Sequence, residues 1–266
     1  MNPKPAKKRT VCVHLDAHVH VYPSYDLTAF LEAALDHMPR CSPTDQHVLC
    51  LAERRDCAFF QFLAQDEISL PSDRFCITAW DPDGAVKIRH LPTNRDLWLV
   101  AGRQYAAAER VEVCALFSDL AIPDGRPLLD IIAEIRDAGA IAALPWGFGK
   151  WFFSRGRLVQ KALDAFPPSE LFLVDTLMRP ACFPDSAPFR RAAREHRPVL
   201  CGTDPLSSHP ASEARLPGLY RSVFSMPFPE DPTRIVPALR AFLTAPTAPI
   251  LPAGDRQSLL TALLRR

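Results

Sequence analysis

The residue types with the clearest chemical potential lie in the stretch from residue 11 to residue 20. Its odd-numbered positions are all apolar. Its even-numbered positions are Cys12, His14, Asp16, His18 and His20. Because a β-strand sends successive side chains to opposite faces, this spacing predicts one apolar face and one face with a carboxylate and three imidazoles. Two histidines two residues apart on one strand face can bind the same metal ion, so we predict that this strand begins a metal site. An ordinary polar interior is the alternative.

More acidic and imidazole side chains lie where later apolar runs end. Glu53, Asp175 and Asp204 each follow such a run, and His209 comes five residues after Asp204. In α/β folds, ligands bind at the carboxyl ends of the strands. We therefore expect a divalent zinc, manganese or iron ion. Its predicted ligands are His18, His20, Glu53, Asp204 and His209. Glu53 and Asp175 are also the candidates for catalytic proton transfer.

Each of these later residues also has a structural interpretation. Asp204 precedes Pro205 and can form a turn or cap a helix. Glu53 can pair with a neighbouring arginine at the surface, Asp175 can cap a helix, and His209 can be an ordinary loop histidine.

Four further residues are candidates for substrate binding. They are Arg54, Gln104, Trp146 and Lys150. An arginine can bind a phosphate through two hydrogen bonds. The loop at 146–151 combines a lysine with aromatic rings and can bind an anion and a flat group. Solvated charges, and aromatic rings that cover the rim of the domain, are the alternative.

Composition limits the choice of partners and compartment. The chain has 266 residues, of which 48% are hydrophobic and 23% are charged, and its formal net charge is +1. This charge gives no overall field for nucleic acid or membrane binding, so we expect a small-molecule substrate. The eight cysteines form no Cys-x-x-Cys pair, and no apolar run is long enough to cross a bilayer. We expect reduced thiols and a cytoplasmic protein, and the oligomeric state stays open.

Apolar runs and turn residues predict alternating strands and helices with an antiparallel insertion. The predicted strands are 11–20, 48–51, 75–80, 85–89, 97–101, 111–117, 140–144, 171–174, 198–203 and 220–226. The predicted helices are 26–38, 58–64, 127–138, 157–166, 185–196, 232–243 and 255–264. Residues 11–245 are expected to form one domain. A flexible basic tail at 1–10 precedes it, and a Pro-rich hinge with a helix at 246–266 follows.

The order of the motifs resembles the polymerase and histidinol phosphatase (PHP) family of phosphoesterases. The segment 16–20 is similar to its opening His-x-His motif, and 100–105 followed by 111–117 is similar to its Gly-x-Glu strand and the next strand. Residues 138–147 resemble its Ala-His-Pro-Gly segment, and 201–204 resemble its Gly-Ser-Asp ending. The resemblance covers most of residues 11–218. It implies an α/β fold, a distorted (β/α)7 TIM-like barrel with some antiparallel β decoration, and hydrolysis of a phosphate ester.

This chain departs from the family pattern at several ligand positions. Glu53 and Arg54 replace an Asp-His pair, Gln104 replaces a glutamate, and Leu206 replaces the last histidine. The histidine before Pro-Gly is also missing, because the chain reads Leu-Pro-Trp-Gly at 144–147. The family's three-metal centre is therefore excluded, and we expect a single ion.

We predict a metal-dependent hydrolase, a small-molecule phosphoesterase, with a reduced metal centre formed by His18, His20 and Asp204. Whether the chain is an enzyme stays open, and two alternatives are kept. The first is a PHP-like barrel that has lost catalysis and serves as a binding or scaffold protein. The second is an amidohydrolase-type C–N hydrolase, a class that also opens with Asp-x-His-x-His. That class has a mid-chain histidine pair, whereas His90 is the only histidine between residues 48 and 195 here.

Overall fold

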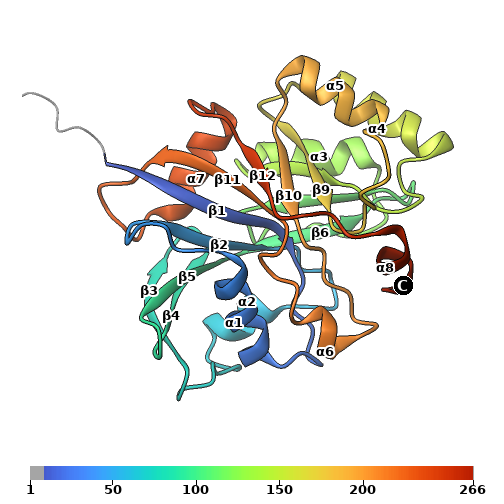
Figure 1. The fold of residues 1–266 in the computed structure, drawn as a ribbon. Helices are drawn as coiled ribbons and strands as arrows, with labels where there is room; N and C mark the ends of the chain where they lie inside the picture. The colour runs from blue at the N-terminus through green and yellow to red at the C-terminus, as the bar shows by residue number, and fades with distance from the viewer. Residues whose placement is uncertain (1–8, 266) are drawn as a thin grey trace, which may run out of the picture.

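The structure is a computed structural model that describes residues 9–265, and most of the predicted basic tail lies outside the described residues. Two sheets organise this part of the chain (Figure 1). The larger sheet has seven strands, in the spatial order β12 (Leu251–Ala253), β11 (Arg221–Pro227), β1 (Thr10–Val19), β2 (Gln46–Leu51), β5 (Arg95–Val100), β4 (Ala85–His90) and β3 (Phe75–Asp81). In this sheet β1, β2 and β5 are parallel neighbours, and the other pairings are antiparallel.

The second sheet has five strands. Their spatial order is β10 (Val199–Gly202), β9 (Leu171–Thr176), β8 (Ile141–Pro145), β7 (Glu112–Leu116) and β6 (Gly102–Ala106). The pairs β10–β9 and β9–β8 are parallel, whereas β8–β7 and β7–β6 are antiparallel. The parallel strands alternate with helices along the chain, as parallel connections require.

Helices alternate with the strands along the described part of the chain. They are α1 (Leu27–His37), α2 (Phe59–Ala64), α3 (Leu128–Asp137), α4 (Phe153–Ala165), α5 (Ala187–Glu195), α6 (Pro210–Glu213), α7 (Ile235–Thr244) and α8 (Leu259–Leu264). α1 and α2 pack on the seven-stranded sheet, and α3, α4 and α5 pack on the five-stranded sheet. Asp26 caps the N-terminus of α1, because its carboxylate accepts a hydrogen bond of 3.1 Å from the Ala29 N–H.

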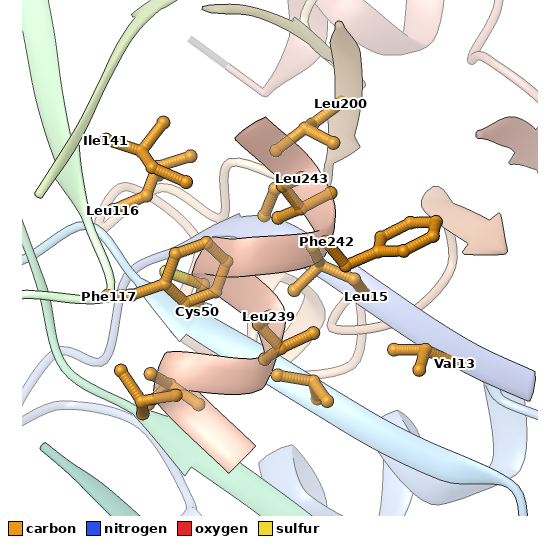
Figure 2. Packing of buried hydrophobic residues seen from close by; sticks show 14 of the residues in the cluster. Val13, Leu15, Cys50, Leu116, Phe117, Ile141, Leu200, Leu239, Phe242 and Leu243 are labelled. Atoms are coloured by element: carbon orange, nitrogen blue, oxygen red, sulfur yellow. The ribbon is translucent and has the colours of Figure 1, made fainter. Parts of the chain in front are cut away.

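One helix, α7, packs between the two sheets and completes the apolar cluster that we call the inter-sheet core. Figure 2 shows Leu239, Phe242 and Leu243 of α7 among side chains from both sheets. The other labelled members come from β1, β2, the β7 region, β8 and β10: Val13, Leu15, Cys50, Leu116, Phe117, Ile141 and Leu200. The apolar residues of α7 recur at helical spacing, which gives the helix one apolar face for this role.

The expected PHP-like (β/α)7 barrel is wrong. The described strands form two open mixed sheets, with six antiparallel pairings and four parallel ones. A (β/α) barrel needs a continuous ring of parallel strands. Here an isolated bridge joins Glu53, two residues after the end of β2, to Arg103 of β6, and no ladder among residues 9–265 closes a ring.

Most predicted elements have an observed counterpart, including the hairpin with its turn at residues 81–84. The pattern of apolar runs did not predict β6, although the family resemblance implied a strand at 100–105. The strand β12 and the short helix α6 were not predicted. The division of the chain at residues 10 and 245 stays a prediction. Within the described part of the chain, none of the helices has the length and apolar character needed to cross a membrane.

Candidate metal centre

A bulge in β1 sets the direction of the two histidines. Pairing with β2 is regular up to Asp16, but Asp16 and Val19 lie opposite residues that are only two apart, so β1 has one extra residue. An extra residue reverses the alternation of the side chains beyond it. Val19 packs with the α1 side of the sheet, whereas His18 Nδ1 lies 3.6 Å from the sulfur of Cys114, a member of the inter-sheet core. The single polar face predicted from sequence is therefore wrong, because Asp16 and His18 leave β1 on different sides.

Asp16 is a structural carboxylate. It is fully buried and accepts hydrogen bonds from the Thr203 N–H at 3.0 Å, the Thr203 hydroxyl at 2.6 Å and the Gly218 N–H at 2.9 Å. Burial raises its pKa to about 7, against the opposite effect of these hydrogen bonds. Asp16 thus ties β1 to the loop that follows β10 and carries Asp204.

Backbone contacts hold Asp204 beside β1. Its N–H donates a 2.9 Å hydrogen bond to the carbonyl of His18. Its φ of +49° lies in the left-handed region, which aspartate tolerates better than most residues. Gly202 allows the close approach, since a Cβ at that position would lie 2.5 Å from the Cβ of His18. The strand end and the loop are therefore joined without an intervening side chain.

The ligand atoms of His18, His20 and Asp204 form a compact triangle. The two Nε2 atoms are 3.1 Å apart, and Asp204 Oδ1 lies 3.5 Å from His18 Nε2 and 3.4 Å from His20 Nε2. A tetrahedral ion with bonds of about 2.0–2.1 Å holds its ligand atoms roughly 3.3 Å apart. Within residues 9–265, this is the one group of three His, Cys, Asp or Glu ligand atoms that all lie within 4.8 Å of one another. The triad can therefore bind a metal ion.

Electrostatics favour the protonation states that a metal needs. Burial is the main cause that lowers the pKa of His18 to about 4, so its imidazole is neutral at neutral pH. Burial acts to raise the pKa of Asp204, but His18 and His20 outweigh it and the net shift is downward. Neutral imidazoles and an ionised carboxylate are the forms that coordinate metals.

The Nδ1 atoms of His18 and His20, which point away from the triangle of ligand atoms, differ in their surroundings. His18 Nδ1 lies beside the Cys114 sulfur, and the Gln104 side chain also hydrogen-bonds to His18. A hydrogen bond donated by an Nδ1–H to the Gln104 carbonyl oxygen would leave the Nε2 lone pair free for a metal. His20 Nδ1 is buried and has no hydrogen-bond partner among the described residues. The histidine pair is therefore oriented mainly through His18.

A cavity of about 310 Å³ opens beside the triad. His20 and Asp204 line it. Of the predicted substrate-binding residues, Arg54, Gln104 and Lys150 line it as well, and the Lys150 ammonium forms an ion pair with Glu112. A second cavity of about 500 Å³ shares Arg54, Gln104 and Glu112 with it. The triad thus faces a space with both cationic and acidic side chains.

Glu53 lies near this region but is not one of the three clustered ligands. It is 1% exposed, and its Oε1 accepts a 3.0 Å hydrogen bond from the Phe60 N–H. Its Oε2 is buried and has no partner within the described chain. Burial raises its pKa to about 7, while the Phe60 N–H and Arg103 act in the opposite direction. Its predicted role as ligand or proton-transfer group stays a prediction.

The other predicted residues lie in different surroundings. Asp175 is bound by both ends of the Arg179 guanidinium, at 2.7 and 2.6 Å, and by the Tyr220 hydroxyl at 2.9 Å. It lines a separate cavity of about 560 Å³. His209 is exposed at the start of α6. Trp146 is 2% exposed and packs against Phe148 and Phe183. Their predicted roles in catalysis, metal binding and substrate binding stay predictions.

Sequence reasoning missed several residues of this region. Cys114 was interpreted only as a buried thiol, and Tyr22 and Met178 of the cavity wall were not singled out. Tyr22 does follow the histidine strand by two residues, which is a usable signal. Cys114 and Met178 have no such signal, because only the fold brings them to the triad.

Comparison with known proteins gives a likeness in fold. No family model and no curated protein sequence matches this chain. PsfC from Pseudomonas syringae PB-5123 is similar over 96% of both chains, with a TM-score of 0.57 and 16% identity. The lesion-specific endonuclease PfuEndoQ from Pyrococcus furiosus is similar over 91% of this chain and 59% of its own length, with a TM-score of 0.54 and 16% identity. An endonuclease Q bound to a 27-mer duplex substrate with an abasic lesion at the active site is similar over 96% of this chain and 67% of its own, with a TM-score of 0.52 and 12% identity.

These likenesses correct the family resemblance inferred from the motifs. The assignment to the PHP family is replaced by a structural likeness to PsfC and endonuclease Q, because the strands form two open sheets and no family model matches. The endonuclease Q complex contains a 27-mer duplex substrate, whereas the composition of this chain favoured no nucleic acid partner. At sequence identities of 12–16%, the comparison supports a similar fold only. The substrate has to be inferred from the residues of this chain.

Proposed function

We propose that this chain is a metal-dependent hydrolase that holds one divalent ion with His18, His20 and Asp204 and acts on a small phosphate ester. The observation that carries the proposal is the triangle of ligand atoms, with sides of 3.1, 3.4 and 3.5 Å. The two Nε2 atoms face each other, and only one proton fits between them, whereas a common ion uses both lone pairs. Zinc, manganese and iron all accept this donor set.

The chemistry divides between the ion and the chain. A bound ion supplies Lewis acidity toward an ester oxygen and lowers the pKa of a water molecule. The chain orients His18 through Gln104 and supplies Lys150 and Arg54 as cations in the cavity wall. Those cations suit a substrate with an anionic group such as a phosphate. The cavity volume of about 310 Å³ suits a small molecule.

A binding or scaffold protein without catalysis is the second candidate. One observation favours it: Glu53, the carboxyl proposed for proton transfer, is not part of the wall of the cavity beside the triad. The carboxylates in that wall are Glu112, which pairs with Lys150, and Asp204 itself. A chain that binds metal but turns over no substrate would fit this second candidate.

Metal content of the purified protein tests the proposal first. We expect about one equivalent of a transition metal in the wild-type chain and its loss in the double variant His18→Ala/His20→Ala. His209→Ala is the matched control, because His209 is exposed at α6 and lies outside the triad. A metal-free protein whose stability does not change in the double variant would overturn the metal centre.

A substrate panel then tests the reaction. Phosphomonoesters and cyclic amides are assayed with added Mn²⁺ or Zn²⁺, and we expect turnover of a phosphomonoester that the double variant lacks. Turnover of a cyclic amide alone would assign the C–N hydrolase alternative. Metal binding with no turnover of either class would favour the scaffold.

A further inference from the structure

Arg265, directly after α8, lies against the loop that carries Asp204. Its side chain is 6% exposed, and Nη2 donates a 2.8 Å hydrogen bond to the backbone carbonyl of Asp204. The same guanidinium binds Glu213, with Nε 2.8 Å from Oε1 and Nη2 2.8 Å from Oε2. A buried guanidinium with this many partners is fixed in position, and so are the groups that it binds.

Glu213 extends the contact to the other side of Asp204. It is 1% exposed at the end of α6, and its Oε2 also accepts a 2.7 Å hydrogen bond from the Leu206 N–H. The pair Arg265–Glu213 therefore binds the chain at the Asp204 carbonyl and again at the Leu206 N–H. On the opposite side, Asp16 holds Thr203. The ligand residue is thus bound on both flanks.

Asp204 needs such restraint. Its backbone has a φ of +49°, a conformation that is uncommon outside glycine and persists only where the surroundings impose it. Its carboxylate must meet the two imidazoles within a few tenths of an ångström for tetrahedral coordination. A relaxed loop would move this carboxylate away from the imidazoles, whose Nε2 atoms lie 3.5 Å (His18) and 3.4 Å (His20) from Asp204 Oδ1.

Side-chain burial contributes little to the docking of α8. Leu260 and Leu264 are each 68% exposed and Leu263 is 49% exposed, whereas Ala262 is 4% exposed. Arg265 supplies the buried polar contacts at this end, and its own carbonyl accepts a 2.7 Å hydrogen bond from the Ser208 hydroxyl. The arginine is therefore the main anchor between α8 and the loop.

We propose that Arg265 is a positioning residue for the metal centre, which it serves by fixing the backbone of Asp204 together with Glu213. This inference rests on the proposed function, because it assumes that Asp204 binds a metal. Residues that orient metal ligands without touching the ion commonly contribute ten- to hundredfold to metal affinity. α8 and its arginine would then be part of the site although they do not line its cavity.

The test compares Zn²⁺ affinity, measured by competition with a chromophoric chelator, in the wild type, Arg265→Met and Arg265→Lys. We expect the methionine variant to bind Zn²⁺ roughly ten- to hundredfold more weakly. Lysine keeps the charge beside Glu213 but loses the fork of donors, so we expect an intermediate affinity.

Arg197→Met is the matched control. Arg197 is 4% exposed and also donates to backbone carbonyls, including those of Phe166 after α4 and Leu171 at the start of β9. It precedes β10, whereas Asp204 of the triad follows the other end of that strand. We expect this variant to lose stability and to keep wild-type Zn²⁺ affinity. An equal loss of affinity in Arg197→Met and Arg265→Met would assign the effect to general destabilisation and overturn the inference.

A second measurement needs no metal. In chelator-treated protein, Arg265→Met should speed backbone amide hydrogen exchange at residues 204–208 and leave β8 unchanged. Unchanged exchange in this loop would overturn the inference, even if the methionine variant bound metal weakly. A wild type that binds no Zn²⁺, Mn²⁺ or Fe²⁺ would overturn the proposed function and the metal role of Arg265. Normal wild-type binding with unchanged affinity in Arg265→Met would overturn this inference alone.

Discussion

At the scale of single residues, Glu53 makes stability depend on pH in a direction that can be measured. Burial raises its pKa to about 7 in the folded chain, whereas a free glutamate has a pKa of about 4.3. The folded state therefore binds this proton more tightly than the unfolded state. The associated stability is full at low pH and is lost as the pH rises through 7.

Glu53→Gln should remove this dependence. The amide keeps an acceptor for the Phe60 N–H and carries no charge at any pH. Between pH 5 and pH 8, we expect the wild type to lose roughly 2–3 kcal/mol of unfolding free energy relative to the variant. Urea unfolding at several pH values, in the presence of a chelator, measures the unfolding free energy of both proteins. Glu67→Gln, at an exposed position, should keep the wild-type slope, and parallel slopes for wild type and Glu53→Gln would contradict the prediction.

The residue types of the site could be predicted from sequence, but their directions could not. His18, His20 and Asp204 stood out because imidazoles and acids lie at the ends of apolar runs. The bulge between Asp16 and Val19 could not be recognised in the sequence, because it is defined by the pairing register of β1 with β2. Alternation alone placed Asp16 with the histidines, whereas in the structure it binds Thr203. The partner strand, and not the strand's own sequence, decided which acid joined the imidazoles.

At the scale of elements, the approach of β10 to β1 positions the centre, and Gly202 permits it. In Gly202→Ala the new Cβ would lie 2.5 Å from His18 Cβ and 2.8 Å from His18 N, so a strand must shift. We expect about 1–3 kcal/mol of lost stability and a loss of metal affinity larger than tenfold. Denaturant unfolding and chelator competition measure the two effects.

Ala142→Val is the matched control for Gly202→Ala. Ala142 is fully buried in β8 and faces the helices α3 and α4 rather than the triad. Overpacking there should cost a similar amount of stability and leave metal affinity unchanged. Equal effects of the two substitutions on metal affinity would show that strand contact at Gly202 does not position the histidine.

The elements that sequence missed share a physical cause. β6 is five residues long and contains Arg103 and Gln104, so it lacks a clear apolar run. Its pairing with β7 makes it a strand, and that pairing is not local information. The longer helices, by contrast, carry their own apolar periodicity, and α3 was expected at 127–138 and found at Leu128–Asp137. Elements that depend on a partner were the ones that local patterns did not reveal.

At the scale of the whole molecule, the inter-sheet core decides the stability. Leu239 of α7 is fully buried among side chains of both sheets (Figure 2). Leu239→Ala should cost about 3 kcal/mol through lost burial and a cavity. Leu260→Ala, at a position 68% exposed on α8, should change stability by less than about 0.5 kcal/mol. Similar values for the two would contradict the assignment of α7 to the central core.

Sheet closure is also a property of the whole molecule, and it is where the sequence-based fold was wrong. Alternating strands and helices favour a barrel, but they do not specify which edge strands pair. Here β1 pairs with β11 in antiparallel register, and within residues 9–265 an isolated bridge joins Glu53, just after β2, to Arg103 of β6. Both are contacts between segments far apart in the chain. A single sequence carries no direct signal for them.

The proposed metal centre has ligands from both sheets, so metal binding should stabilise the entire fold. His18 and His20 belong to the end of β1 in the seven-stranded sheet, and Asp204 follows β10 of the five-stranded sheet. An unfolded chain does not hold these groups together, so an ion at a hundredfold excess over its Kd should add about 2.7 kcal/mol to stability.

For a chain of this size, that gain raises the Tm by roughly 5–10 °C. Differential scanning calorimetry of chelator-treated protein, with and without Zn²⁺ or Mn²⁺, measures the shift. His18→Ala/His20→Ala should unfold at the same temperature with and without metal, whereas His209→Ala should keep the shift. A shift that survives in the double variant would place the ion elsewhere, because only an ion bound between the sheets depends on both imidazoles and on the carboxylate from the other sheet.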